Sequence, residues 1–277
     1  MVVPVDDLRS LTTLRFFAAM MIVLLHAKLY FAWAWLQFVP GTLVHGVSFF
    51  FVLSGFILTH VYTSNPIPSY FRFVMLRAGR LWPIHAFAAL ILVISALTPL
   101  AIVRPDSITF DGDGIFNRWY VLAMNLAMVH SLSPYLVHIF SWNSVSWSIS
   151  TEFGFYLVFP FLIVRIEKTW GWKLAASAGL VVAMLVADHL FTLTRGAGSN
   201  ELAPTYANPL FRGFEFCLGM AAYVFWHRHI RNADLSPWAT KFMRFPFVGE
   251  LQQSALRPVT RSWGFLFCRL CGDGFGG

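Results

Sequence analysis

Long apolar stretches constrain this chain more than any other feature of its sequence. A helix that crosses a bilayer needs about 20 largely apolar residues, because the hydrocarbon core is about 30 Å thick. Six stretches are long enough, and they lie at approximately 11–32, 43–62, 84–103, 147–166, 173–191 and 207–226. A seventh stretch, 119–132, is short and contains Asn125 and His130.

Composition supports a membrane protein and excludes a soluble binding module. Of the 277 residues, 57% are hydrophobic and 12% are charged, whereas an average soluble domain has about 25% charged residues. The net charge of +7 is explained by Lys and Arg gathering on the cytoplasmic side of a membrane. We therefore expect membrane lipids as partners and no nucleic acid.

The distribution of Lys and Arg predicts how the chain is oriented. Arg9 lies before the first stretch, and Arg72 lies in the hydrophilic break 63–83, so both are expected in the cytoplasm together with the N-terminus. If 119–132 crosses the membrane fully, the basic residues after it face outward, and if it is re-entrant, they face the cytoplasm. Because Lys and Arg gather on the cytoplasmic side, the charge distribution favours the re-entrant arrangement. The sequence thus predicts an all-α, polytopic transmembrane bundle with six full spans plus one short or re-entrant segment.

The last fifth of the chain differs from the rest. After residue 226 no run is long enough to span, and residues 227–277 are expected to form a basic tail that is poorly ordered or out of frame. Cys268 and Cys271, with two histidines at the start of the tail, have the ligand types of a zinc site. Because only one Cys pair is present, an ordinary tail is favoured and no metal is expected.

Two ionisable residues share one face of the first stretch. Arg15 and His26 are eleven residues apart, which is about 1,100° of helical rotation and roughly 16 Å of rise. A cation near the cytoplasmic surface therefore lies in line with an imidazole near mid-membrane. Each residue also has a structural interpretation, since Arg15 can reach the headgroups and His26 can bond within the bundle.

Three further runs contain polar residues where apolar ones are expected. The run FFVLSGF at 50–56 includes Ser54, and both this serine and the glycine beside it also suit helix packing. Arg77 and Arg80 lie one turn apart before Pro83, which is expected to open the third span. Such paired guanidiniums suit phosphate binding as well as membrane anchoring. The third run, WSISTE at 147–152, ends in Glu152, which needs a cation or water near the outer end of a span.

In these runs the sequence resembles the acyltransferase-3 family of integral membrane O-acyltransferases. The resemblance covers about 8–226, which we expect to be a membrane acyltransferase domain. Relatives have more spans than this chain, so it is expected to be C-terminally truncated, and Ser48 stands where many relatives carry Asp. The matching motifs are Arg15-x10-His26, the run at 50–56, Arg77-x-x-Arg80-Leu-x-Pro83, Trp147-Ser148 leading to Glu152-x-x-Phe155-Tyr156 and, more weakly, Arg212-x-x-x-Phe216-x-x-Gly219.

The resemblance implies transfer of an acyl group, expected to be acetyl, from cytoplasmic acyl-CoA to a hydroxyl of a cell-surface carbohydrate or small molecule, in a bacterial cytoplasmic membrane. Acetyl-CoA would be a co-substrate, with no tightly bound cofactor. His26 would be the general base and Ser54 an oxyanion donor. The remaining assignments are Glu152 as a third catalytic residue, Arg15, Arg77 and Arg80 for the CoA phosphates, and Tyr156, Trp147 and Ser148 for the acceptor.

Two alternatives remain open at this point. A membrane transporter or flippase would use the same intramembrane charges as a substrate path, although the sequence has no internal repeat of the kind many transporters contain. An inactive fragment of an acyltransferase would insert in the membrane and turn over nothing.

Overall fold

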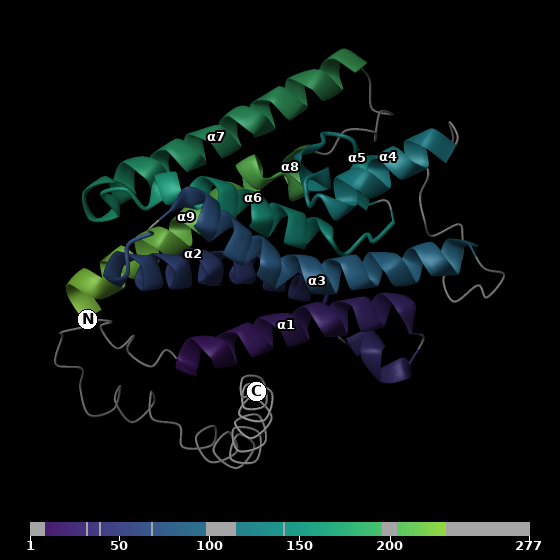
Figure 1. The fold of residues 1–277 in the computed structure, drawn as a ribbon, viewed down its shortest axis with the longest axis horizontal. Helices are drawn as coiled ribbons and strands as arrows, with labels where there is room; N and C mark the ends of the chain where they lie inside the picture. The colour runs from purple at the N-terminus through teal and green to yellow at the C-terminus, as the bar shows by residue number, and fades with distance from the viewer. Residues whose placement is uncertain are drawn as a thin grey trace, which may run out of the picture. The chain divides into compact units, whose positions relative to one another are not determined.

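The computed structural model describes residues 9–31, 33–38, 40–67, 69–97, 115–140, 142–195 and 204–230. Within these ranges the chain is helical and contains no strand, as predicted. Long helices lie side by side in a bundle, with α6 (Trp147–Leu162) among them (Figure 1). The predicted tail lies outside the described residues, apart from the short π-helix η5 (Trp226–Ile230).

The predicted apolar stretches correspond to helices. They are α1 (Arg9–Tyr30), α2 (Gly46–Ser64), α3 (Tyr70–Leu97), α6, α7 (Ile166–Arg195) and α9 (Pro209–Phe225). Among the described residues, four helical segments are long and apolar enough to cross a membrane: Leu11–Lys28, Gly41–Ser64, Tyr70–Ile94 and Ile166–Leu190. Helices α6 and α9, with 16 and 17 residues, are shorter than the usual span of about 20.

The third helix departs from the prediction. Pro83 was expected to open it, but α3 begins at Tyr70 and Pro83 lies inside the helix. Most of the hydrophilic break 63–83 is therefore helical. The reason is that its arginines alternate with aromatic and aliphatic residues, and Arg, Leu, Met and Ala are good helix formers. Arg77 and Arg80 consequently lie on the first half of a long helix rather than in a loop.

The stretch 119–132 is divided between two elements. Helix α4 (Ile115–Leu126) ends before Met128, which has a φ of 57°, and the 3-10 helix η4 (His130–Leu132) follows. Asn125 and His130 are both buried, and the side chains of both reach Ser146 Oγ at 3.2 Å. Within the bundle these polar residues therefore tie the segment to the loop before α6.

The remaining described elements are short. The 3-10 helices η1 (Ala34–Phe38) and η2 (Gly41–His45) connect α1 to α2. Helices α5 (Leu136–Phe140) and α8 (Pro204–Ala207) precede α6 and α9, respectively.

Helices α2 and α9 approach each other so closely that their backbones touch. A Cβ atom on Gly55 would lie 2.1 Å from Phe216 O, and a Cβ on Gly219 would lie 1.9 Å from Val52 O. Only glycine permits this approach. Buried aromatic rings fill the neighbouring space, with Phe155 stacked 4.8 Å from Phe216. The glycines of two predicted motifs thus bring α2, α6 and α9 into one core.

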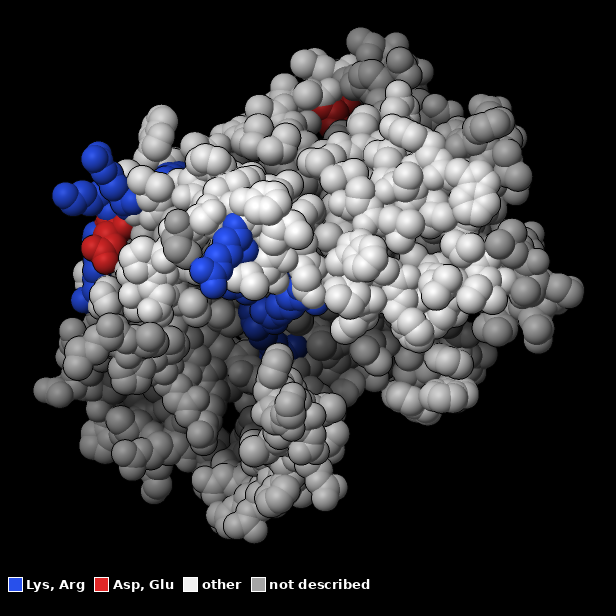
Figure 2. All heavy atoms as spheres, viewed as in Figure 1, with Lys and Arg blue, Asp and Glu red and all other residues white. Residues whose placement is uncertain are grey.

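The surface of the bundle is largely uncharged. On the face drawn in Figure 2, the described acidic and basic residues form only a few small groups, and the other described residues, in white, are uncharged. Many large apolar side chains are exposed, including Phe16 at 59%, Ile84 at 76% and Trp172 at 77%. Exposed apolar area of this extent fits a lipid-facing surface.

Candidate active site

A glutamate lies at the centre of the predicted site residues. Ser54 Oγ on α2 donates to Glu152 Oε1 on α6 over 3.0 Å. The hydroxyl of Tyr156, one turn further along α6, donates to the same oxygen. Two of the predicted motifs therefore meet at one carboxylate. Since a hydroxyl has a single hydrogen, Ser54 cannot donate to a reaction intermediate while this bond is intact.

One of the three predicted phosphate-binding arginines, Arg15, links this carboxylate to the other two. Arg15 on α1 interacts electrostatically with Glu152 and Tyr156, and also with Arg77 and Arg80 on α3. Among the described residues, its buried Nε atom has no hydrogen-bond partner. Arg15 thus interacts with two further cations and one carboxylate, which leaves an excess of positive charge and a free donor on Arg15. This arrangement suits a ligand with several negative charges, such as a phosphate group.

Arg77 is held among aromatic rings. Its Nη2 donates to the hydroxyl of Tyr62 over 3.1 Å. Its guanidinium carbon lies 5.5 Å from the ring centres of Tyr62 and Phe73 and 5.7 Å from that of Tyr156. These distances are within the range of cation–π contacts. Arg77 is therefore fixed in position, whereas Arg80 is exposed.

His26 is oriented by its own helix. Its Nδ1 lies 2.8 Å from the carbonyl oxygen of Ile22, one turn earlier on α1. A carbonyl oxygen can only accept, so Nδ1 carries a hydrogen, and in the neutral ring Nε2 is then the basic nitrogen. No direct hydrogen bond joins His26 to Glu152 or to the arginines in the described part of the chain. The structure thus links six predicted site residues in one cluster, to which His26 makes no direct hydrogen bond among the described residues.

The residues predicted to bind the acceptor are divided. Tyr156 belongs to the cluster around Glu152. Trp147 is buried at the start of α6, where its ring lies 5.0 Å from that of Tyr206 on α8. The hydroxyl of Ser148 donates to Val145 O, 3.2 Å away.

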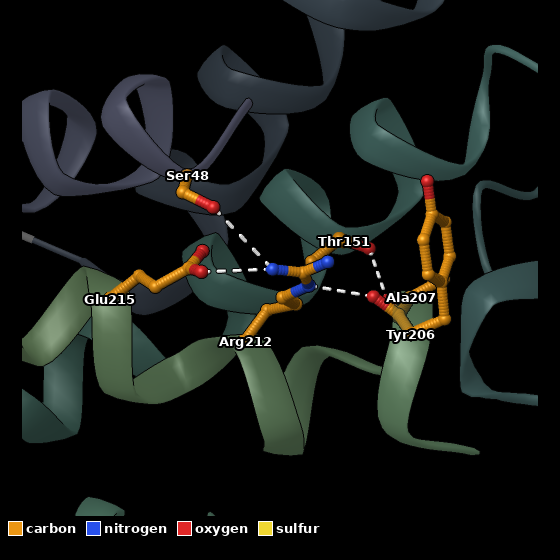
Figure 3. A network of polar contacts seen from close by, with 6 residues as sticks. All are labelled: Ser48, Thr151, Tyr206, Ala207, Arg212 and Glu215. Carbon is orange, nitrogen blue, oxygen red and sulfur yellow. Dashed lines mark hydrogen bonds and ion pairs between the residues drawn. The ribbon is translucent and has the colours of Figure 1, made fainter. Parts of the chain in front are cut away.

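Arg212 forms a polar network with residues of α2, α8 and its own helix (Figure 3). Its Nε donates to Tyr206 O at 2.6 Å, and its Nη1 donates to Glu215 Oε1 at 2.9 Å and more weakly to Ser48 Oγ at 3.5 Å. Its guanidinium carbon lies 5.7 Å from the ring centre of Trp147. Nearby, Thr151 donates to Ala207 O.

The sequence interpretation missed several members of these networks. Tyr62, Tyr206 and Glu215 lie in no predicted site, and Arg212 entered only as part of a weak motif. Glu215 follows Arg212 by three residues, which is the spacing of an ion pair on one helix face. That spacing is visible in the sequence. Nothing in the sequence pointed to Tyr62, whose partner Arg77 lies on another helix.

The acyltransferase-3 family model, described as an acyltransferase domain, matches residues 8–249. The chain belongs to this family. It is a membrane protein, because the family match agrees with the four long apolar helices found among the described residues. The family match extends to residue 249, beyond the predicted domain end at 226. No solved structure matches the chain.

Curated relatives resemble the chain over most of its length. Acyltransferase MdmB of Streptomyces mycarofaciens is 31% identical over 77% of this chain and 56% of its own length. Nodulation protein 10 of Rhizobium leguminosarum bv. viciae is 29% identical over 78% of this chain and 59% of its own. Exopolysaccharide production protein ExoZ of Rhizobium meliloti is 28% identical over 65% of this chain and 50% of its own length. The chain spans about half the length of the curated relatives it matches.

Proposed function

We propose that the protein transfers an acyl group, most simply acetyl, from cytoplasmic acyl-CoA to a hydroxyl group of a carbohydrate or another small acceptor. The observation that carries this proposal is the cluster in which Arg15 interacts electrostatically with Arg77, Arg80 and Glu152, with the guanidinium carbon of Arg77 5.7 Å from the ring centre of Tyr156. The arginines supply cations for the CoA phosphates. Family membership supports the reaction class.

We propose that the chain lies in the inner membrane of a bacterium, with its N-terminus in the cytoplasm. The six full spans in this proposal are α1, α2, α3, α6, α7 and α9. In Figure 1 the starts of α1 and α7 lie at the same end of the bundle as the end of α9. Arg228 in η5 donates to Glu167 O at the start of α7, which agrees with this order. Basic residues thereby gather on one side.

The α4 segment fits this topology as a re-entrant insertion. Its 12 residues give a helix of about 18 Å, which is too short for a hydrocarbon core of about 30 Å. Helix α3 leads to one side of the membrane and α6 returns from it. The α4 segment between them then enters and leaves the membrane on that side.

His26 is proposed as the general base, because its Nε2 is the nitrogen left with a lone pair. Nε2 takes the proton of the acceptor hydroxyl while the hydroxyl oxygen attacks the thioester carbonyl carbon. The carbon–sulfur bond breaks, and the CoA thiolate takes the proton from the imidazolium. The pantetheine arm would extend from the arginines toward His26. A covalent acyl-histidine is the variant of this route.

Glu152 and Ser54 are proposed to act between the donor and the base. Glu152 stabilises the arginine cluster, and Ser54 holds the carboxylate in place until substrate binding frees its hydroxyl for the developing oxyanion. Tyr156, Trp147 and Ser148 are proposed to border the acceptor path. Of these, Tyr156 is the residue in direct contact with Glu152.

The test is thioester loss from acetyl-CoA by the purified protein in lipid nanodiscs, with acceptors added in turn. We expect His26→Ala to lower the rate by about 100-fold or more, the usual contribution of general base catalysis. His189→Ala is the matched control, because His189 is an exposed histidine on α7, and it should leave the rate unchanged. A near-normal rate in His26→Ala would exclude His26 as the base.

A further inference from the structure

Arg212 and Glu215 form an ion pair outside the cluster around Glu152. Their side chains are 18% and 19% exposed, and 2.9 Å separates Arg212 Nη1 from Glu215 Oε1. Figure 3 shows the pair between Ser48 of α2 and Tyr206 of α8. The pair is therefore sheltered from its surroundings and still reachable from outside.

The pair retains unused hydrogen-bonding capacity. A guanidinium has five N–H groups, and the bonds of Arg212 to Tyr206 O, Glu215 and Ser48 use only those on Nε and Nη1. Among the described residues, nothing accepts from its Nη2. Glu215 Oε2 is buried and likewise has no partner there. The last side-chain torsion of Glu is broad, so a small rotation presents this acceptor.

We infer that Arg212 and Glu215 form an acceptor subsite for a neutral ring with several hydroxyl groups, such as a pyranose. Arg212 Nη2 donates to one hydroxyl oxygen, and Glu215 accepts the hydrogen of a neighbouring hydroxyl. The carboxylate neutralises the guanidinium, so the subsite favours an uncharged ligand over an anion. This inference rests on the proposed function and names the chemistry of the acceptor.

Aromatic rings complete the subsite. The guanidinium carbon of Arg212 lies 5.5 Å from the ring centre of Tyr206, and 38% of Tyr206 is exposed. Aromatic rings provide flat apolar surface beside polar groups, which matches the C–H face of a sugar ring. The buried ring of Trp147 packs against both Arg212 and Tyr206.

The position of the subsite along the helices would let a bound acceptor reach the acyl donor. On α2, Ser48 precedes Ser54 by six residues, or about 9 Å. On α6, Trp147 precedes Glu152 by five residues, or about 7.5 Å. Gly46 packs against Ile22 of α1, one turn before His26. Along the bundle, the subsite therefore lies between the Glu152 cluster and the level of His26.

The experiment uses the full chain in phospholipid nanodiscs, which avoids sugar-based detergents. Saturation-transfer NMR measures binding of the methyl glycosides of glucose, galactose and mannose, with methyl glucuronoside as the anionic counterpart. Acetyl-CoA binding is measured in the same preparations. We expect Glu215→Gln to weaken binding of a neutral glycoside by about tenfold, as for a lost hydrogen bond to a charged group, and to leave acetyl-CoA binding unchanged.

Two more variants separate binding from folding. Tyr206→Leu keeps the ion pair and removes the ring, so it should also weaken glycoside binding without changing acetyl-CoA binding. Glu167→Gln makes the same chemical change at an exposed position on α7 and should alter neither.

Three results would overturn the subsite: no glycoside binding by the wild type, a preference for the glucuronoside, or binding unaffected by Glu215→Gln. Glycoside binding that depends on Glu215 in a chain that binds no acetyl-CoA would support the subsite and contradict the proposed function.

Discussion

Ser54 and Glu152 lie 98 residues apart in the sequence and share a hydrogen bond of 3.0 Å. Ser54 is 2% exposed, so this bond forms where little water competes with it. A buried bond to a charged group contributes more than an ordinary one. The contact therefore fixes α2 against α6 at the level where the arginines of α1 and α3 gather.

A double-mutant cycle on this pair should show coupling. We expect the single changes Ser54→Ala and Glu152→Gln to lower the free energy of unfolding, with a coupling energy of about 1–3 kcal/mol in the double variant. Unfolding in mixed micelles measures it. The control pairs Ser54→Ala with Thr169→Ala, a distant, partly buried residue at the start of α7, and these two changes should add. Additive changes at Ser54 and Glu152 would contradict a direct bond.

The α2–α9 contact predicts opposite outcomes for two glycines on one helix. Gly219→Ala should lower the free energy of unfolding by about 3 kcal/mol, because overpacking forces the backbones apart. A Cβ on Gly213 meets nothing within 4 Å, so Gly213→Ala should be neutral or stabilising by up to about 1 kcal/mol. Thermal unfolding compares the two variants. Equal destabilisation by both would rule out the close backbone approach.

The aromatic enclosure of Arg77 predicts that lysine cannot replace it. A lysine ammonium lacks the planar fork that bonds Tyr62 and lies over its ring. We expect Arg77→Lys to raise the KM for acetyl-CoA by about tenfold, the loss of one charge-assisted bond. Arg72→Lys, at an exposed arginine on the same helix, is the control. A tenfold rise in Arg72→Lys as well would indicate a general charge effect and not the enclosure.

The proposed re-entrant segment predicts one-sided labelling. In a cysteine-free background, Tyr120→Cys and Tyr135→Cys introduce single thiols at residues that are 58% and 49% exposed. A membrane-impermeant maleimide should label both from the outer face of spheroplasts. Glu167→Cys, at the start of α7, should be labelled only after permeabilisation. Labelling of Tyr120→Cys and Tyr135→Cys from opposite faces would mean that this segment crosses the membrane.

Helix positions followed from hydropathy because each apolar run carries its own length and composition signal. The ends of the helices were predicted less accurately than their positions. Pro83 lies inside α3 although it reads as a helix start, because the good helix formers before it extend the helix. That extension also packs against α6, where Tyr70 donates from its hydroxyl to Leu157 O. The local sequence does not show this tertiary contact.

Which site residues meet was only partly predictable. Arg15 and Glu152 were each unusual in an apolar run, so the cost of burying charge identified them. Their proximity was not predictable, because helix phase places residues on a face and does not tell which helices adjoin. Glu152 was expected near the outer end of its span with a cation or water as its partner, but the sequence did not indicate which cation, and Arg15 interacts with it electrostatically.

The glycine contact between α2 and α9 has a consequence for the order of assembly during synthesis. Gly55 follows Ser54 directly, so the turn of α2 that carries Ser54 rests on α9. At 5–20 residues per second, the ribosome needs roughly 10–30 seconds to proceed from α2 to α9. During that time α2 lacks its closest neighbour. The arginine and carboxylate cluster therefore takes its final form late, after one of the last described helices has joined the bundle.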